Sequence, residues 1–301
     1  MKKTDAPHPI NSVSELHRLL SLPRPDHPLL SVIDLKKIGS FKDFNVGSVV
    51  FNFYSIWLER GVEGKFMYGQ SYLDFDEGTL IFISPGQVLQ VKGTHKIDSG
   101  MGLIFHPDFI LNYPLGKTIK NYGFFSYAVN EALHLSEKEE SMILSIMENI
   151  LEECQSKIDR FSQGIILSQI ELLLQQADRY YHRQFITRNH ADHELLTRVE
   201  TLLKEYFNSE NHSLPTVQQL AAQVHLSPNY LSDMLRTITG QNAQQHIHNK
   251  LIEKAKELIS ATSLSVSEIS YRLGFEHSQS FSKLFKNKTN LSPLEFRRTF
   301  N

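Results

Sequence analysis

Two sets of polar side chains near the C-terminus have the types and spacing that suit contacts with DNA bases and phosphates. Apolar residues in each segment must face a core, so the remaining side chains face outward. The first set is Asn229, Ser232, Asp233 and Arg236, and the second is Ser278, Gln279, Ser282, Lys283 and Lys286. Asn and Gln can make bidentate contacts with adenine, and Lys can contact guanine. Arg236 and Lys286 come later in their segments and suit phosphate contact. These residue types predict a surface that reads double-stranded DNA.

Both sets lie in a pattern that occurs twice in roughly the last hundred residues. Leu220–Leu226 matches Ile269–Phe275 at an offset of 49 residues, and Leu231–Arg236 matches Phe281–Lys286 at an offset of 50. A short helix, a tight turn and a second helix form a helix-turn-helix, whose second helix can enter a major groove. The sequence therefore predicts two such units, joined by a long helix from about Ala243 to Ser260.

Start and stop signals frame the predicted helices. Capping boxes or N-caps occur at Thr216/Gln219, Ser227-Pro228, Ser265/Glu268 and Ser292/Glu295. Gly240 and Asn290 follow the two second helices, where a left-handed residue is favoured, and Gly274 lies in the second turn. The two copies thus share their helix start and stop signals as well as their apolar pattern.

The C-terminal segment resembles the AraC/XylS family of transcription regulators. The residues that carry the resemblance are Leu226–Ser232, Gly274-Phe275, Ser280–Lys286 and Leu291–Arg297. The resemblance implies promoter DNA as partner, with the outward positions named above reading it, and a tandem site of two adjacent major-groove faces. It also implies a cupin-like sensor barrel for a small effector, a homodimer, and RNA polymerase as a possible partner.

Asp233 departs from the family, which more often has a basic residue at this position. A carboxylate can accept a hydrogen bond from cytosine but is repelled by phosphates. Two interpretations stay open: Asp233 contacts a base, or it is solvated or pairs locally with Arg236 three residues later. On the second interpretation, the first copy reads bases weakly and the second carries most of the specificity.

Bulk composition fits a protein with more than one domain and a basic DNA-binding part. The chain has 301 residues and a formal net charge of −2, of which residues 195–301 carry +3 and the remainder −5. It has no apolar run of about 18 residues, so we expect no membrane partner. There is no apolar segment behind the basic start, and Cys154 is the single cysteine. A cytoplasmic location without an intrachain disulfide is expected.

The N-terminal half has the pattern of short strands between about Ser31 and Phe105. Gly61–Gly64, Asp76–Gly78 and Ser84–Gly86 punctuate these strands like turns. Phe75–Gly86 resembles, loosely, the family's cupin-like sensor barrel. Cupin enzymes hold a metal with histidines, and Lys65–Leu73 has none, so we expect no metal and no cofactor. Candidate effector-lining residues are Phe51, Phe53, Trp57, Tyr68 and Tyr72, although strand aromatics more often pack a core.

Two amphipathic helices, from Ser136 to about Ile158 and from about Ser162 to His182, are expected after the barrel. They predict an antiparallel hairpin that covers the barrel or mediates dimerisation. The polar stretch from Gln184 to Glu194 is interpreted as irregular. The predicted domains are residues 1–185, a linker at 186–194, and residues 195–301.

The predicted fold class is α+β, with an N-terminal cupin-like β-barrel and helical hairpin before an all-α domain of two helix-turn-helix units. The predicted function is sequence-specific transcription regulation controlled by a small-molecule effector, without enzymatic activity. Two alternatives stay open: a ligand-independent regulator whose barrel only dimerises, and a cupin-fold enzyme with a DNA-binding appendage.

Overall fold

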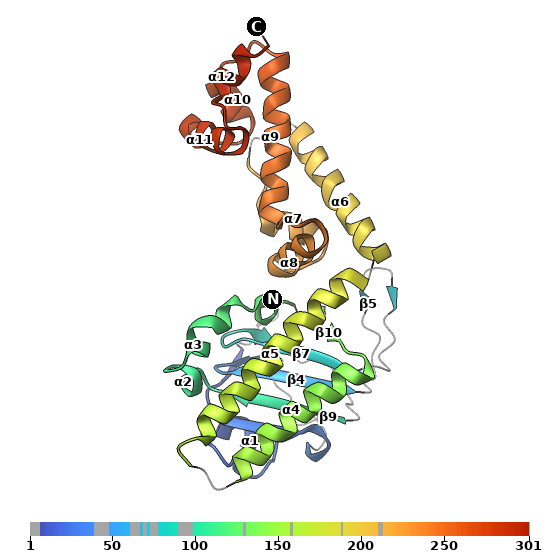
Figure 1. The fold of residues 1–301 in the computed structure, drawn as a ribbon, viewed down its shortest axis with the longest axis vertical. Helices are drawn as coiled ribbons and strands as arrows, with labels where there is room; N and C mark the ends of the chain where they lie inside the picture. Colours follow the sequence, from blue (N-terminus) through green and yellow to red (C-terminus); the bar gives the residue numbers. More distant parts are fainter. Residues whose placement is uncertain are drawn as a thin grey trace, which may run out of the picture. The chain divides into compact units, whose positions relative to one another are not determined.

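The computed structural model divides into two compact units, Met1–Gln184 and Phe185–Asn301 (Figure 1). The described residues are 7–38, 48–60, 67–68, 71–72, 78–89, 99–128, 131–156, 159–187, 189–209 and 213–300. Strands occur in the first unit, and the described residues of the second contain helices without strands. The coarse prediction of an α+β chain with an all-α C-terminal part is therefore confirmed.

A five-stranded antiparallel sheet forms the centre of the N-terminal unit. Its strands, in spatial order, are β10 (Leu133–His134), β7 (Thr79–Ile83), β4 (Tyr54–Arg60), β9 (Ser99–Phe105) and β2 (Leu30–Asp34). Alternate side chains of a strand point to opposite faces. Ile56 and Leu58 therefore lie on one face of β4 and Trp57 on the other, and all three are buried. Both faces of the sheet are thus covered.

A second, three-stranded sheet and a helix share a core with the Trp57 face. They are β1 (His8–Ile10), β3 (Val49–Phe51), β8 (Val88–Leu89) and α1 (Val13–Leu19). The shared core includes Ile33, Trp57, Ile83 and Ile104 from the large sheet, with Val13, Leu16, Val49 and Phe51 from the smaller elements. β5 (Met67–Tyr68) and β6 (Ser71–Tyr72) form a separate pair.

The described strands form three separate sheets and not one closed barrel, so the cupin-like barrel stays a prediction. Of the predicted turns, Ser84–Gly86 is present, with Gly86 at φ 83° donating from its N–H to Phe51 O. Gly61–Gly64 and the first two residues of Asp76–Gly78 lie outside the described residues.

Helices α4 (Glu137–Gln155) and α5 (Ser162–Thr187) cover the Ile56 face of the large sheet (Figure 1). The first of the two predicted helices begins as expected, and Ser136 and Glu139 form a capping box at the start of α4. Arg183, near the end of α5, donates to Glu139 Oε2 over 2.7 Å and to His134 O over 2.8 Å. The start of one helix therefore lies beside the end of the other, which confirms the antiparallel hairpin.

Short helical segments complete the N-terminal unit. They are η1 (Leu35–Lys37), α2 (Pro107–Ile110), α3 (Pro114–Thr118), η3 (Ile119–Asn121) and η4 (Gly123–Ser126). Phe124 and Phe125 of η4 pack against Phe82, on the same sheet face as α5. These aromatic contacts extend the core that the hairpin covers.

The stretch predicted to be irregular is largely helical, which corrects the sequence interpretation. α5 continues to Thr187, and α6 (Asn189–Asn208) begins six residues before the predicted start of the C-terminal domain at residue 195. The polar composition suggested a loop, but residues 184–194 contain neither Gly nor Pro, so nothing in them interrupts a helix. The domain boundaries around this stretch stay a prediction.

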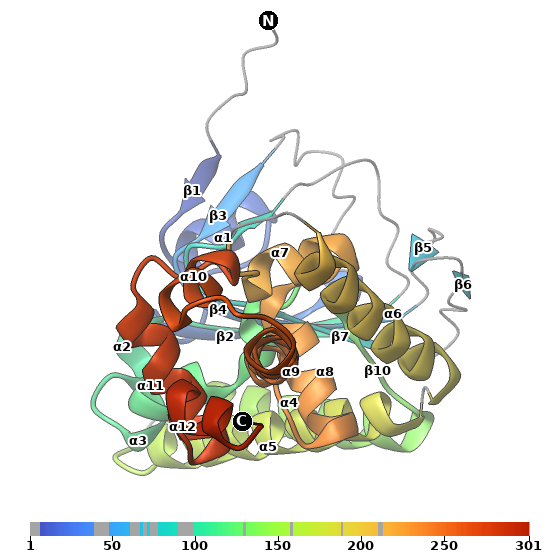
Figure 2. The same ribbon diagram turned by 90° about the horizontal axis from the view of Figure 1, so that it is seen from above.

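The C-terminal unit places a helix pair toward each end of one long helix. The elements are α6, α7 (Val217–Gln223), α8 (Pro228–Thr239), α9 (Ala243–Ala261), α10 (Val266–Arg272), α11 (Ser278–Thr289) and α12 (Pro293–Arg298). Seen along α9, α7 and α8 lie on one side and α10, α11 and α12 on the other (Figure 2). The predicted capping boxes at Thr216, Ser265 and Ser292 are all present.

Candidate nucleic-acid interface

The turns between α7 and α8 and between α10 and α11 have the same backbone pattern. The Leu226 N–H donates to Ala221 O over 2.9 Å, and the Phe275 N–H donates to Ser270 O over 3.0 Å. The residue before each donor has positive φ, 59° for His225 and 92° for Gly274. Such a left-handed residue closes the first helix and lets the chain turn sharply. The repeat predicted from the sequence is therefore confirmed in the backbone.

Buried side chains fix the orientation of α8. Leu231, Met234 and Leu235 are at most 1% exposed, as predicted, and Tyr230, which the sequence analysis did not single out, is also buried. Ser227 caps the helix by accepting from the Tyr230 N–H, and Gly240 ends it in the left-handed conformation. With this face held against the core, the opposite face of α8 points to solvent.

Helix α11 is held in the same way by aromatic side chains. Phe281 and Phe285 are fully buried, and they pack with Phe275 and Phe296. Asn290 adopts the left-handed conformation at the end of the helix, the position that Gly240 has in the first copy. The predicted substitution of asparagine for glycine at this cap is confirmed.

The structure places all nine predicted DNA-contacting residues on α8 and α11, in two groups. Asn229, Arg236, Gln279, Lys283 and Lys286 are exposed, and Ser232, Asp233, Ser278 and Ser282 are partly exposed. None of the nine is buried, so each group leaves side chains on the solvent side of its helix. Their contact with DNA stays a prediction.

The two reading helices, α8 and α11, differ in charge. On α8, Arg236 Nη1 lies 3.0 Å from Asp233 Oδ1, so its one basic side chain is paired with its one acidic side chain. Helix α11 carries Lys283, Lys286 and Lys288 and no acidic residue. The local pairing that the sequence left open for Asp233 is therefore present. An exposed pair of this kind stabilises a helix by only about 0.3–0.5 kcal/mol, so its main effect is to leave α8 without free positive charge.

Among the basic residues of the C-terminal unit that were not singled out from the sequence, three lie on or beside α11 and α12. Arg297 lies in a stretch that carries the family resemblance, yet its guanidinium donates to Leu264 O over 2.6 Å and so ties α12 to the chain before α10. Lys288 and Arg298 are exposed. Lys288 could have been found from its position two residues after Lys286 on a helix that already carries lysines.

The aromatic residues proposed to line an effector site lie mostly in the N-terminal core. Phe51, Phe53 and Trp57 are at most 9% exposed, and the rings of Phe51 and Phe53 stack at 5.1 Å. Tyr68 and Tyr72 belong to β5 and β6, but their side chains lie outside the described residues. The packing interpretation accounts for the first three, and a role in effector binding stays a prediction.

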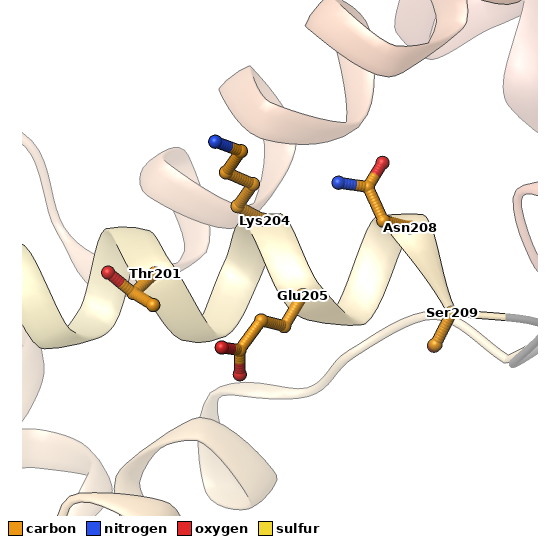
Figure 3. A pocket seen from close by; sticks show the side chains of 5 residues that line it. All are labelled: Thr201, Lys204, Glu205, Asn208 and Ser209. Carbon is orange, nitrogen blue, oxygen red and sulfur yellow. The ribbon is translucent and has the colours of Figure 1, made fainter.

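A shallow hollow of about 490 Å³ lies along α6, away from the predicted residues (Figure 3). Its lining residues are Thr201, Lys204, Glu205, Asn208 and Ser209. The labelled side chains point in different directions, with Lys204 and Glu205 on opposite sides of the helix. The Asn208 side-chain oxygen Oδ1 already accepts from Lys254 Nζ of α9. These side chains do not converge as a small-molecule site requires.

Other candidate centres are few in the part of the chain that the structure describes. No three His, Cys, Asp or Glu side chains there are grouped so as to hold a metal ion together. Cys154 is buried, and burial, followed by the Asp26 and Glu153 carboxylates, raises the pKa of its thiol to about 11. No described helix is both long and apolar enough to span a lipid bilayer.

Comparison with known proteins associates the reading helices with transcription regulators. A family model described as a helix-turn-helix domain matches residues 220–299. The chain is 26% identical to YfiF of Bacillus subtilis (strain 168), an HTH-type transcriptional regulator, over 83% of this chain and 78% of that protein. It is 33% identical to the transcriptional activator RhaS of Salmonella schwarzengrund (strain CVM19633) over 34% of this chain and 36% of that one.

A solved structure matches the same part of the chain. The C-terminal domain of AraT, a response regulator from Geobacillus stearothermophilus, is 30% identical over 35% of this chain and 84% of that one, with a TM-score of 0.32. Of the two relatives named above, this chain spans most of the length of YfiF but only about a third of the length of RhaS.

Proposed function

The C-terminal domain of this chain is a helix-turn-helix domain of the AraC type, and we propose that the whole chain is a sequence-specific transcription regulator. The observation that carries the proposal is the pair of matched helix-turn-helix units at the two ends of α9, each with polar side chains on the solvent side of its second helix. A rigid helix between two readers suits one duplex read at two successive major-groove faces. The bound site would therefore be asymmetric, with two boxes about one helical turn apart.

Of the two helix-turn-helix units, the second, which contains α11, would contribute most of the affinity and specificity for DNA. The three lysines of α11 face no acidic residue on their own helix, whereas Arg236 of α8 is paired with Asp233. Phosphate attraction depends on the charge that remains free on the reading surface. Helix α8 would thus mainly fix the register, with Asn229 as its main base-contacting side chain.

The N-terminal unit would supply control by a small effector and self-association. An exposed apolar stripe, formed by Phe161 directly before α5 and by Ile165 and Leu172 on it, would meet the same stripe of a second copy. The molecular mass of the full chain in solution, measured at several protein concentrations, tests whether two copies associate. The two sheets that share a core would form a cupin-like sensor domain, and RNA polymerase would be a further partner at the promoter.

Selection of bound DNA from a random pool by the full chain tests the proposed function directly. We expect enrichment of an asymmetric sequence with two boxes, the better defined of which is read by α11. If the full chain enriches nothing, residues 185–301 are tested alone, because they form a separate compact unit. Enrichment by this part alone would mean that the N-terminal unit restrains the reader, and no enrichment by either would refute the proposal.

Replacing Lys286 and Gln279 separates affinity from sequence preference. Lys286→Ala removes a phosphate contact, so we expect binding to weaken about equally on all sequences and the salt slope to fall by about 1. Gln279→Ala is expected to cost about 1–3 kcal/mol on the selected site and to relax one base position. Titrations of each variant on the selected site and on its single-base variants measure both effects. An unchanged base preference in Gln279→Ala would show that Gln279 does not read DNA.

Asp233→Asn tests whether the acidic residue weakens the first reader. The change keeps the side-chain shape but releases Arg236 and removes one negative charge from α8. We expect tighter binding on every sequence and a salt slope larger by about 1, because one more phosphate contact forms. A loss of preference at one cytosine without tighter binding would instead show that Asp233 accepts a hydrogen bond from that base.

A further inference from the structure

Glu59 lies on the inner face of the large sheet, two residues after Trp57 on β4. Alternation along β4 puts Ser55, Trp57 and Glu59 on the face that shares a core with the small sheet, while Arg60 points to the opposite face. Burial decreases along this row, from fully buried Ser55 to Trp57 at 9% exposure and partly exposed Glu59. The face therefore changes from a closed apolar core to a polar, more open end at Glu59.

The neighbouring strands offer Glu59 no charged partner. Thr79 of β7 and Gly100 of β9 lie directly opposite it, and neither strand contains an ionisable residue. Lys36 and Lys37 of η1, which contacts β9, are both exposed, and Asp34 accepts from the Lys36 N–H. Among the described residues no side chain or backbone group hydrogen-bonds to the Glu59 carboxylate. Burial consequently raises the pKa of Glu59 to about 7.

Glu140, on the other side of the same sheet, shows how this chain satisfies a buried carboxylate. Glu140 is 2% exposed, and its Oε2 accepts from Arg60 Nη2 over 2.9 Å. Adjacent residues of β4 thus differ: Arg60 neutralises the carboxylate on the helix side, whereas Glu59 faces inward without a partner among the described residues. A desolvated carboxylate without a partner attracts a cation strongly.

Trp57 precedes Glu59 by two residues on the same face of β4, and its indole is held in one orientation. Its Nε1–H donates to Ser55 Oγ over 3.0 Å, and its six-membered ring lies against Gly102, where any side chain would collide with it. Tryptophan is the aromatic residue that attracts cations best through the face of its ring. A carboxylate and a fixed indole on one face of a strand can together recognise an organic ammonium group, which has both charge and apolar surface.

We propose that Glu59 and Trp57 form the recognition site for a small organic cation, such as a primary amine, in the N-terminal unit. The proposal rests on the proposed function insofar as this cation would be the effector. The ammonium group would donate to the Glu59 carboxylate, and the carbon attached to it would lie against Trp57. Because the cation replaces a proton on Glu59, its affinity rises with pH up to about pH 7, by at most tenfold per pH unit, and is constant above that.

Trp57 is the only tryptophan of the chain, so its fluorescence reports on this site alone. The full chain is titrated with benzylamine, a cation with an aromatic body, and with benzyl alcohol, its uncharged counterpart. We expect a saturable change in Trp57 emission with benzylamine and none with benzyl alcohol. Glu59→Gln should weaken benzylamine binding at least about tenfold, the loss of one charge-assisted hydrogen bond. Glu148→Gln, which alters an exposed carboxylate of α4, should leave binding unchanged.

Three results would each overturn the proposal: no saturable response to benzylamine, an equal response to benzyl alcohol, or unchanged binding in Glu59→Gln. Tighter binding of benzoate at low pH would also overturn it, because it would show that neutral Glu59 holds an anion. The DNA selection is done without ligand, so the two proposals can fail separately. A chain that selects DNA but ignores benzylamine keeps its function and lacks this site, and the reverse result keeps the site alone.

Discussion

Gly274→Ala is expected to destabilise the second helix-turn-helix unit by more than about 3 kcal/mol and to abolish specific DNA binding. Gly274 has φ 92°, which costs a residue with a side chain about 1–2 kcal/mol. A Cβ there would also lie 2.5 Å from the carbonyl carbon of Ser213 and 2.6 Å from Leu214 N. Both are backbone atoms, so the segment before α7 would have to move. Unfolding of residues 185–301 in urea, followed by circular dichroism, measures the loss.

Two variants of the first helix-turn-helix unit separate the strain of a left-handed backbone from the close approach of other atoms. Gly240 has φ 76° and no atom within 4 Å of a built Cβ, so Gly240→Ala should cost only about 1 kcal/mol. His225 occupies the position of Gly274 in the first copy at φ 59°, so His225→Gly should stabilise the chain by up to about 1 kcal/mol. Equal losses in Gly240→Ala and Gly274→Ala would show that the approach of Ser213 and Leu214 is not what requires glycine.

Sequence reasoning succeeded where structure depends on neighbouring residues. The capping boxes at Thr216, Ser265 and Ser292 are local hydrogen bonds whose partners are three residues apart, and all were predicted. The repeat added a check, because each feature of one copy could be compared with the other. Sequence reasoning failed at residues 189–194. Their polar composition suggested a loop, and the absence of Gly and Pro was the better guide to the helix.

Features that depend on distant segments could not be predicted. The sequence places Gly274 in a turn, but not beside the Ser213 backbone, which is 61 residues away in the chain. Alternation predicts strands between Ser31 and Phe105, but not that β2 pairs with β9 or that β7 lies between β4 and β10. The sequence shows that Ser55, Trp57 and Glu59 are alternate residues, which share one face of a strand. The burial of Glu59 was not visible in the sequence, because both faces of β4 are covered by elements distant in sequence.

Glu59→Gln is expected to stabilise the N-terminal unit at alkaline pH and to have little effect at acidic pH. The usual pKa of 4.5 applies in the unfolded chain, and burial raises it to about 7 in the folded chain. The folded protein therefore binds a proton more tightly, so this contribution to stability is complete below the unfolded pKa. It is lost as pH rises from about 4.5 to 7 and stays constant above that. Glutamine has no such titration, so the variant should exceed the wild type by up to about 3 kcal/mol near pH 8.

Urea unfolding at several pH values, followed by the emission of Trp57, measures this difference. Trp57 lies in the N-terminal unit, so its emission follows that unit even if the two units unfold separately. Histidines also titrate in this range, but they are common to both proteins, and the difference between variant and wild type removes their contribution. Glu148→Gln should follow the wild type at every pH, because its carboxylate is exposed. A stabilisation by Glu59→Gln that does not change between about pH 5 and pH 8 would show that Glu59 is ionised throughout, and that an organic cation would displace no proton when it binds.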